Sequence, residues 1–288
     1  MNLSFNLKKL RKSPHSVVVV RGGGDLATGI IVRLKKAGFY VIALECAHPT
    51  SIRRTVSLSE AVYDGEKEVE GIKAVLVHTF SDAVSLSSIS GVVPVLVDEN
   101  AQSVKRIRPL VLVDAIMAKR NLGTSINDAD LVIGVGPGFT AGIDCHAVIE
   151  TMRGHYLGSV IKEGSAEPNT GIPGLVGGVS SERVVHAPSS GIVKGIRNIG
   201  DSVEKDSVIA LIGDVEVKAP ISGTLRGLIR SGLTVKKGFK IADVDPRNVK
   251  EYITTCSDKA KAIAGGVLEA ILSSVSWAII ESDDGLEV

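Results

Sequence analysis

A glycine-rich loop at residues 21–27 (RGGGDLA) has the spacing best suited to binding a ligand. It satisfies Gly-x-Gly-x-x-Ala, follows an apolar run and opens a helical pattern. In that context the first glycine allows a tight turn, the second lets the backbone approach a pyrophosphate, and the alanine lets the helix pack closely on the strand. Unpaired amides and the helix dipole would then face the anion. We predict a cofactor-binding loop made of Arg21, Gly22, Gly23, Gly24, Asp25 and Ala27.

Acidic residues near this loop favour two different interpretations. Glu45 ends the next apolar run, 23 residues after Gly22, where a carboxylate can accept hydrogen bonds from a ribose. Asp25, by contrast, places a negative charge in the first helical turn, where it would repel a phosphate. Arg21 can offset that charge or pair with either acid. The alternative interpretation is a glycine turn that only lets helix and strand pack.

A second glycine loop and an arginine pair are expected at the same edge of a parallel sheet. Gly134, Gly136 and Gly138 follow another apolar run, and clustered amides of this kind can form an anion-binding nest. Arg53 and Arg54 follow the second predicted strand, and arginines bind phosphate or carboxylate groups bidentately. We predict that all five residues contact the cofactor, although an irregular turn and a solvated loop explain them equally well.

Nucleophile and metal signals are weak. Asp144 and Cys145, which are followed by His146, and the isolated Cys46 are the only catalytic candidates that we name, and the catalytic residues stay unknown. The six histidines show no ligand spacing, and the sequence contains no Gly-x-Ser-x-Gly nucleophile elbow. We therefore predict no metal site and leave open whether the protein is an enzyme.

Composition narrows the class of partner. The chain has 288 residues, a net charge of +1, 44% hydrophobic and 3% aromatic residues. This balance favours a globular protein and argues against nucleic-acid and membrane partners. The three cysteines form no disulfide framework, residues 1–16 lack the apolar core of a signal peptide, and the apolar stretch at 263–280 is interrupted by polar residues. We expect a cytoplasmic protein, and homo-oligomerisation stays open.

Apolar runs alternate with longer segments in the first part of the chain, a pattern typical of α/β proteins with a mostly parallel sheet. The runs span 17–20, 40–44, 74–77, 92–97, 110–113 and 131–135, with a helical pattern at 26–37. We predict a tail at 1–16, a Rossmann-like nucleotide- or anion-binding domain at 17–163, a connector at 164–182, an all-β domain at 183–247, and a C-terminal helix and tail at 248–288, with the helix at 257–280.

Residues 187–242 contain two copies of one sequence repeat. With a shift of 32 positions, residues 187–210 overlay residues 219–242 without a gap, and 10 of 24 positions are identical. Each copy is too short to bury its own apolar face. The repeat therefore predicts two equivalent strand sets that close a single core.

The repeat resembles the half-domains of lipoyl and biotinyl carrier domains, which form a barrel-sandwich hybrid fold. The resemblance rests on Ala-Pro-x-x-Gly followed by Gly-x-x-Val in each copy. In the carriers a modified lysine occupies the tip of the hairpin between the halves. Here the expected tip is Gly213–Asp214, and Lys218 lies at the foot of the hairpin. We therefore predict no covalent biotin or lipoate.

Several longer motifs resemble the YqeB-type accessory proteins of selenium-dependent molybdenum hydroxylase systems. They are RGGGDLATG (21–29), SLSEAVYDG (57–65), VDAIMAKRN (113–121), VIGVGPGFTAGID (132–144), VIETMRGHYLG (148–158), PNTGIPG (168–174), VDPR (244–247) and SDKAKAIAGGVLEAI (257–271). The resemblance implies a maturation factor whose partners are a molybdenum hydroxylase or other maturation proteins.

Four functions follow from these observations. The first is a cofactor chaperone that holds a molybdopterin dinucleotide, and the second is an NAD(P)-dependent oxidoreductase. The third is a selenium or sulfur transfer protein that uses a cysteine thiolate. The fourth is an assembly scaffold with empty glycine loops.

Overall fold

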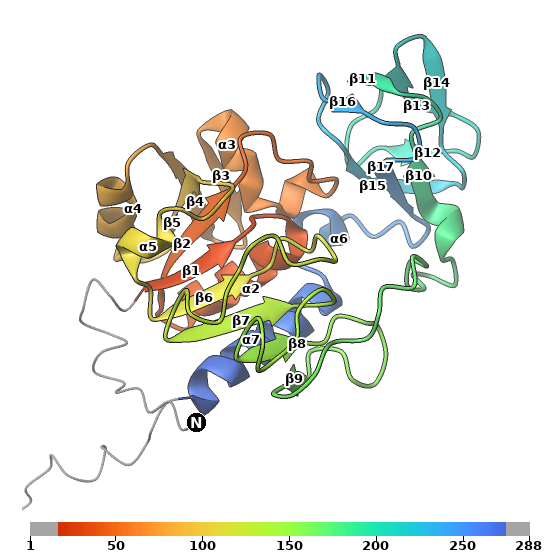
Figure 1. The fold of residues 1–288 in the computed structure, drawn as a ribbon. Coiled ribbons are helices and arrows are strands. Elements are labelled where there is room, and N and C mark those ends of the chain that lie inside the picture. Colours follow the sequence, from red (N-terminus) through yellow and green to blue (C-terminus); the bar gives the residue numbers. More distant parts are fainter. Residues whose placement is uncertain (1–16, 275–288) are drawn as a thin grey trace, which may run out of the picture.

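The computed structural model describes residues 17–274, so the predicted tail at 1–16 and the predicted helical residues 275–280 lie outside the described residues. The chain forms a mixed α/β domain with a large, mostly parallel sheet, followed by a small domain with two antiparallel sheets (Figure 1). None of the helices in the described part of the chain is long and apolar enough to cross a bilayer.

The large sheet has the strand order β3-β4-β5-β2-β1-β6-β7-β8-β9. Neighbouring strands are parallel except in the two edge pairs, β3 with β4 and β8 with β9. The run β5-β2-β1-β6-β7-β8 has the 3-2-1-4-5-6 order of doubly wound dinucleotide-binding sheets. The strands are β1 (Val17–Arg21), β2 (Tyr40–Glu45), β3 (Glu66–Val69), β4 (Ile72–Val77), β5 (Val92–Val97), β6 (Val111–Asp114), β7 (Leu131–Val135), β8 (Ala147–Ile149) and β9 (Val160–Ile161).

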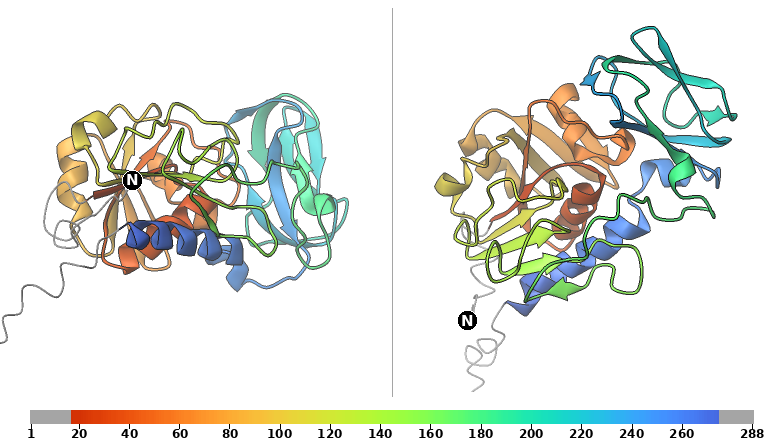
Figure 2. Two further views of the ribbon diagram at one scale, coloured as in Figure 1. Left: turned by 60° about the horizontal axis from the view of Figure 1, so that its bottom comes forward. Right: turned by 45° about the vertical axis from the view of Figure 1, so that its right-hand side comes forward.

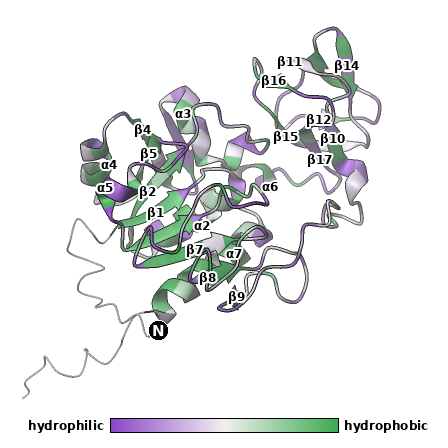
Figure 3. Cartoon of the chain, in the orientation of Figure 1, coloured by the Kyte–Doolittle hydropathy of each residue, from purple (hydrophilic) through white to green (hydrophobic). Residues whose placement is uncertain are grey.

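Each face of this sheet is covered by a separate apolar core, because side chains alternate along each strand. Val18 and Val20 of β1 face the core with α2 (Asp25–Lys36) and α7 (Asp258–Ser273), whereas Val17 and Val19 face the core with α4 (Phe80–Ser87) and α5 (Val104–Ile107). Figure 2 shows α2 and α7 side by side. In Figure 3 the central strands are uniformly hydrophobic, as strands buried on both faces must be.

The small domain follows the sequence repeat strand for strand. One sheet has the order β10-β17-β15-β12 and the other β14-β13-β11-β16. The 32-residue shift relates β11 to β15, β12 to β16 and β13 to β17, so the sheets are equivalent and enclose one core. The hairpin tip is Gly213–Asp214. The strands are β10 (Val184–His186), β11 (Gly191–Gly195), β12 (Ser202–Val203), β13 (Val208–Ile212), β14 (Val215–Lys218), β15 (Gly223–Leu228), β16 (Thr234–Val235) and β17 (Lys240–Asp245).

The β10-β17-β15-β12 sheet docks on the loop that follows β2. Leu228 N donates to Ile52 O at 2.9 Å, and Arg54 Nε donates to Leu228 O at 2.7 Å. A Cβ at Gly227 would approach Ile52 Cγ2 to 2.7 Å, so glycine permits this contact. The remaining short elements are η1 (Arg54–Val56), η2 (Leu58–Glu60), α3 (Ala61–Asp64), η3 (Ser181–Arg183) and α6 (Glu251–Thr254).

Arg230 forms the polar part of the same interface. Its Nε is 3.1 Å from Glu60 Oε2, its Nη2 is 2.6 Å from Asp64 Oδ1, and its guanidinium lies 4.5 Å from the centre of the Tyr63 ring. Burial raises the pKa of Glu60, and the charge of Arg230 opposes that rise. Since Glu60 is buried, this ion pair depends on the two domains staying together.

Neighbouring glycines in α7 test the packing of that helix on the sheet domain. A Cβ at Gly266 would approach Gly158 O to 2.1 Å, whereas a Cβ at Gly265 would meet nothing within 4 Å. We expect Gly266→Ala to lower the free energy of unfolding by about 1–3 kcal/mol. Gly265→Ala, the matched control, should raise it by up to about 1 kcal/mol through helix propensity. Urea denaturation measures both, and equal effects would contradict this packing.

Candidate functional site: a basic cavity between the two domains

The first glycine loop is filled by the protein itself. Gly22 has a φ of +98°, donates from its amide to Leu44 O at 2.7 Å, and lies so close to Ala115 that a Cβ would come within 3.0 Å of the carbonyl oxygen. A Cβ at Gly23 would come within 2.9 Å of Ser59 N. The glycines thus let residues 59 and 115 pack where the sequence predicted a pyrophosphate.

The Glu45 carboxylate accepts a hydrogen bond from the Gly23 amide, which is one of the donors that a phosphate in this loop would need. Its Oε2 accepts from Gly23 N at 2.7 Å, and its Oε1 accepts from Cys46 N at 2.8 Å. Both carboxylate oxygens are therefore engaged within the chain. This geometry corrects the prediction for Glu45. Its carboxylate accepts hydrogen bonds from the backbone of the loop, and it does not project an oxygen toward the position predicted for a ribose.

The Arg21 side chain is buried within the α/β domain. It is 3% exposed and forms an ion pair of 3.1 Å with Asp114 on the neighbouring strand. It also donates to Thr124 Oγ1 and to Glu99 O. We therefore correct the prediction for Arg21, since its guanidinium donates to buried groups of the α/β domain.

The second glycine loop is also tightly packed. A Cβ at Gly134 would approach Phe139 Cγ to 2.4 Å, and one at Gly138 would approach the Arg120 backbone to 2.6 Å. Gly136 donates from its amide to Ile149 O at 2.9 Å. The three glycines thus serve packing, and they do not form an open nest. Neighbouring Val135 and Pro137 do line a cavity.

The cysteine candidates have the wrong electrostatics for nucleophiles. Burial raises the pKa of Cys145 to about 11, and burial together with the charge of Glu45 raises the pKa of Cys46 to about 11. Asp144 accepts from Thr140 N at 2.8 Å, and His146 Nδ1 accepts from Val132 N at 2.9 Å. Because thiolates are the reactive form, the structure argues against both cysteines as nucleophiles, and the Asp144 carboxylate is engaged by the backbone of its own loop. No cluster of three metal-ligating side chains occurs within residues 17–274.

The candidate site is a cavity of about 800 Å³ between the domains, beyond the carboxyl ends of β1 and β7. Asp25 and Leu26, at the first turn of α2, form part of its wall, so the start of that helix opens onto it. Of the predicted cofactor-binding residues, only Asp25 and Arg53 line this cavity. The doubly wound sheet thus places a cavity near its carboxyl edge, but displaced from the glycine loops toward the β domain.

Basic side chains dominate the polar lining of this cavity. They come from both domains and from α7, and they outnumber the acidic ones by seven to three. The basic residues are Arg53, Lys119, Arg153, Arg183, Arg226, Lys240 and Lys259, and the acidic ones are Asp25, Glu167 and Asp243. Because the whole chain has a net charge of +1, this excess is local and gives the cavity a positive potential.

All three lysines of the lining lack a counter-charge among the described residues. The side-chain amines of Lys119, Lys240 and Lys259 form no ion pair or hydrogen bond with any residue that the structure describes. Burial lowers the pKa of Lys240, and burial together with the charge of Arg153 lowers the pKa of Lys259. Lys240 is nevertheless open to solvent within the cavity. An anion that entered would therefore stabilise the charged form of the Lys240 and Lys259 amines.

Arg53 and Arg54 have different roles although they are adjacent. Arg53 is 7% exposed, lies 3.5 Å from Asp25 Oδ2 and donates to Tyr252 O at 2.8 Å. Arg54 instead donates to Leu228 O in the domain interface. The predicted pair thus contributes one side chain to the cavity and one to the docking of the domains.

Six of the seven basic residues were not predicted as site residues: Lys119 follows β6, and the other five lie in the β domain or in the segments before and after it. Arg183, Arg226 and Lys240 come from the β domain, and Arg153 and Lys259 flank it. A usable signal was the difference between the two repeat copies. Position 243 is Asp where its equivalent, residue 211, is Leu, and position 245 is Asp where residue 213 is Gly. Such acids on a buried sheet face indicate buried cations.

Fold and cavity together define a two-domain α/β protein with a cavity between a doubly wound sheet and a repeat-built β domain. The chain is 48% identical over 282 residues to the uncharacterized protein YqeB of Escherichia coli K12, a match that covers 98% of this chain and 52% of that protein. The chain thus spans about half the length of this curated relative. The similarity supports the YqeB-type resemblance of the sequence motifs. No protein-family profile matches the chain.

Comparison with solved structures adds little. The product-bound ectoine utilization protein EutE (DoeB) of Ruegeria pomeroyi aligns with a TM-score of 0.23 and 13% identity, over 83% of this chain and 61% of that one. An aspartoacylase family protein of Mesorhizobium loti aligns with a TM-score of 0.25 and 13% identity, over 80% of this chain and 84% of that one. At these scores the likeness carries no weight for function.

The raised thiol pKa values can be tested by alkylation. The pKa of Cys46 rises from 9.0 to about 11, so its thiolate population near neutral pH should be roughly a hundredfold below that of an unperturbed cysteine. We expect slow iodoacetamide modification of Cys46 in the folded protein, with a rate that climbs steadily above pH 9. Mass spectrometry of the Cys46 peptide gives the rate, and the urea-unfolded protein is the control. Rapid modification of the folded protein at pH 7 would restore Cys46 as a nucleophile.

Proposed function

We propose that this protein binds a multiply anionic organic ligand between its domains and acts as a maturation factor for selenium-dependent molybdenum hydroxylases. The excess of seven basic over three acidic side chains in the cavity supports the ligand class. Its volume of about 800 Å³ lies within the range of cofactor sites. A molybdopterin-type cofactor or its dinucleotide combines the required organic body and negative charge.

The YqeB-type resemblance supports the maturation role. Under this proposal the cavity holds the cofactor or a precursor and presents it to a molybdenum hydroxylase or to another maturation protein. The first glycine loop then has a structural role, because it connects β1 to the start of α2. The repeat domain, which we propose to be a lipoyl/biotinyl-like fold without the carrier lysine, serves as a fixed wall of the cavity and does not swing.

The alternative functions have less support from the geometry. An NAD(P)-dependent oxidoreductase would need the Gly23 amide and the Glu45 carboxylate, which bind each other at 2.7 Å. A cysteine-based transfer protein would need a reactive thiolate, whereas the pKa of each of the three cysteines is raised to about 11. A binding protein requires neither feature.

Calorimetric titration tests the ligand class. We expect molybdopterin dinucleotide to bind, and its affinity to fall several-fold as ionic strength rises, because opposite charges attract across a partly solvated cavity. Lys259→Gln should weaken binding through the loss of one positive charge. Lys261→Gln, two positions along α7 and not part of the cavity lining, is the matched control. NAD(H) and NADP(H) titrations should give no comparable signal, and their saturable binding would favour the oxidoreductase.

A cellular test addresses maturation separately. In a host that makes a selenium-dependent molybdenum hydroxylase, deletion of the gene should abolish hydroxylase activity while the hydroxylase polypeptide accumulates. Complementation with Lys259→Gln should restore less activity than complementation with Lys261→Gln. Full hydroxylase activity in the deletion strain would contradict the maturation role, whatever the calorimetry shows.

A further inference from the structure

We propose that Arg53, Arg183, Arg226 and Lys240 form a subsite for a phosphate monoester or diphosphate group, with the organic part of the ligand lying toward the apolar wall of the cavity. This proposal rests on the proposed function and specifies which end of the ligand binds where. We call these four residues the phosphate subsite.

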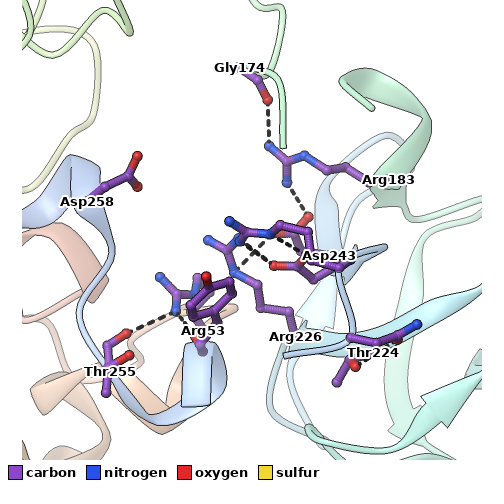
Figure 4. A network of polar contacts seen from close by, with 12 residues as sticks. Arg53, Gly174, Arg183, Thr224, Arg226, Asp243, Thr255 and Asp258 are labelled. Atoms are coloured by element: carbon purple, nitrogen blue, oxygen red, sulfur yellow. Dashed lines mark hydrogen bonds and ion pairs between the residues drawn. The ribbon is translucent and has the colours of Figure 1, made fainter. Parts of the chain in front are cut away.

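Three separate segments bring the arginines together. Arg53 comes from the loop after β2, Arg183 from the end of η3 at the start of the β domain, and Arg226 from β15. Their side chains are 7%, 9% and 10% exposed, so each is at least nine-tenths buried. Figure 4 shows Arg183 and Arg226 beside Asp243, with Arg53 next to them on the side of Thr255. Lys240, on β17, lines the same cavity.

The phosphate subsite has more donors than acceptors. Asp243 Oδ1 accepts from Arg183, but Asp243 Oδ2 is 3.9 Å from Arg226 Nε, beyond hydrogen-bond range. Among the described residues, Arg226 makes one hydrogen bond, from Nη1 to Asp245 Oδ2 at 3.2 Å. The Nε atoms of all three arginines are buried without a hydrogen-bond partner. Buried donors are rarely left unsatisfied in this way.

The acidic residues nearby do not remove this surplus. Asp25 is 3.5 Å from Arg53 Nη1, and Asp245 is already engaged by Arg247, with Arg247 Nη2 at 2.7 Å from Asp245 Oδ2. Asp243 is the single carboxylate between Arg183 and Arg226. Lys240 adds a further positive charge with no ion-pair partner in the described chain. A dianion would compensate the excess that these acids leave.

A phosphoryl group fits this arrangement better than a carboxylate. It carries up to two negative charges and several oxygens that diverge from one centre, whereas a carboxylate carries one charge and two coplanar oxygens. Guanidinium groups that approach from different segments can each donate to a different phosphoryl oxygen. The ligand's phosphate would thereby contact both domains, since Arg53 belongs to one and Arg226 to the other.

The remaining lining of the cavity suits the organic part of the ligand. Leu26, Met117, Val135 and Met152, all from the α/β domain, provide an apolar wall. Methionine side chains adapt to irregular and aromatic surfaces. Ile172 of the connector is 71% exposed and also lines the cavity, so the ligand can cover it. A ligand with an anionic end and a ring system matches both halves of the lining.

The repeat supplies a matched pair of variants for the test. Arg226 and Lys194 are equivalent positions of the two copies, and Lys194 is exposed on the sheet that does not border the cavity. We expect Arg226→Gln to weaken binding of pyrophosphate to the full-length protein by roughly tenfold or more. Arg226→Lys should recover part of that loss, and Lys194→Gln should bind like the wild type. Calorimetry and ³¹P NMR line broadening measure the binding, and thermal unfolding checks that the variants fold.

Four outcomes would overturn the proposal in different ways. Unchanged pyrophosphate affinity in folded Arg226→Gln would place the phosphate elsewhere. Citrate that binds as tightly as pyrophosphate, with the same loss in Arg226→Gln, would show a general anion site without phosphate preference. Loss of molybdopterin dinucleotide binding in Lys259→Gln but not in Arg226→Gln would retain the proposed function and reject only this subsite. If the wild type binds no anion, the proposed function fails as well.

Discussion

The contact between Leu228 and Ile52 is the constraint on which the candidate site depends. It pairs the backbone of β15 with the loop after β2, and the absence of a side chain at Gly227 allows it. Two residues before Leu228 lies Arg226, and one residue after Ile52 lies Arg53. The same contact that joins the domains therefore sets these two guanidinium groups opposite each other. A shift of β15 by one residue would turn Arg226 to the other face of its sheet.

Bringing like charges together opposes this docking, and other contacts must offset the repulsion. The charge of Arg226 lowers the pKa of Arg53, although burial lowers it more. Arg230 follows Leu228 by two residues, and its ion pairs to Glu60 and Asp64 favour association of the two domains. The domain interface thus combines an attractive ion-pair cluster with a repulsive cation cluster. Ligand binding would remove the repulsive part, since only an added anion neutralises the cavity without separating the domains.

Much of the α/β domain was predictable from the sequence, but the candidate site was not. The apolar runs at 17–20 and 131–135 correspond to β1 and β7, because buried parallel strands need continuous hydrophobic residues. The glycine spacing also placed a tight turn correctly at Gly22. It could not show what fills the turn, since Glu45 and Ala115 reach it only through the tertiary fold. The cationic lining was hidden for a related reason, as Arg53, Arg183 and Arg226 are far apart in sequence and share no spacing.

The repeat shows how the cavity wall differs from an ordinary sheet surface. The two sheets have the same strand order and share one core, so their inner faces meet the same packing requirement. Their outer faces differ, because one is docked and the other is open. On the open sheet Ile192 is 59% exposed, and the position equivalent to Asp243 is Leu211. On the docked sheet the equivalent of Ile192 is Thr224, and Arg226 and Asp243 are both buried. Folding of the repeat alone does not require these charges, since its other half lacks the acids and closes the same core. We therefore attribute the buried charges of the docked sheet to the cavity, where they face the cations of the α/β domain.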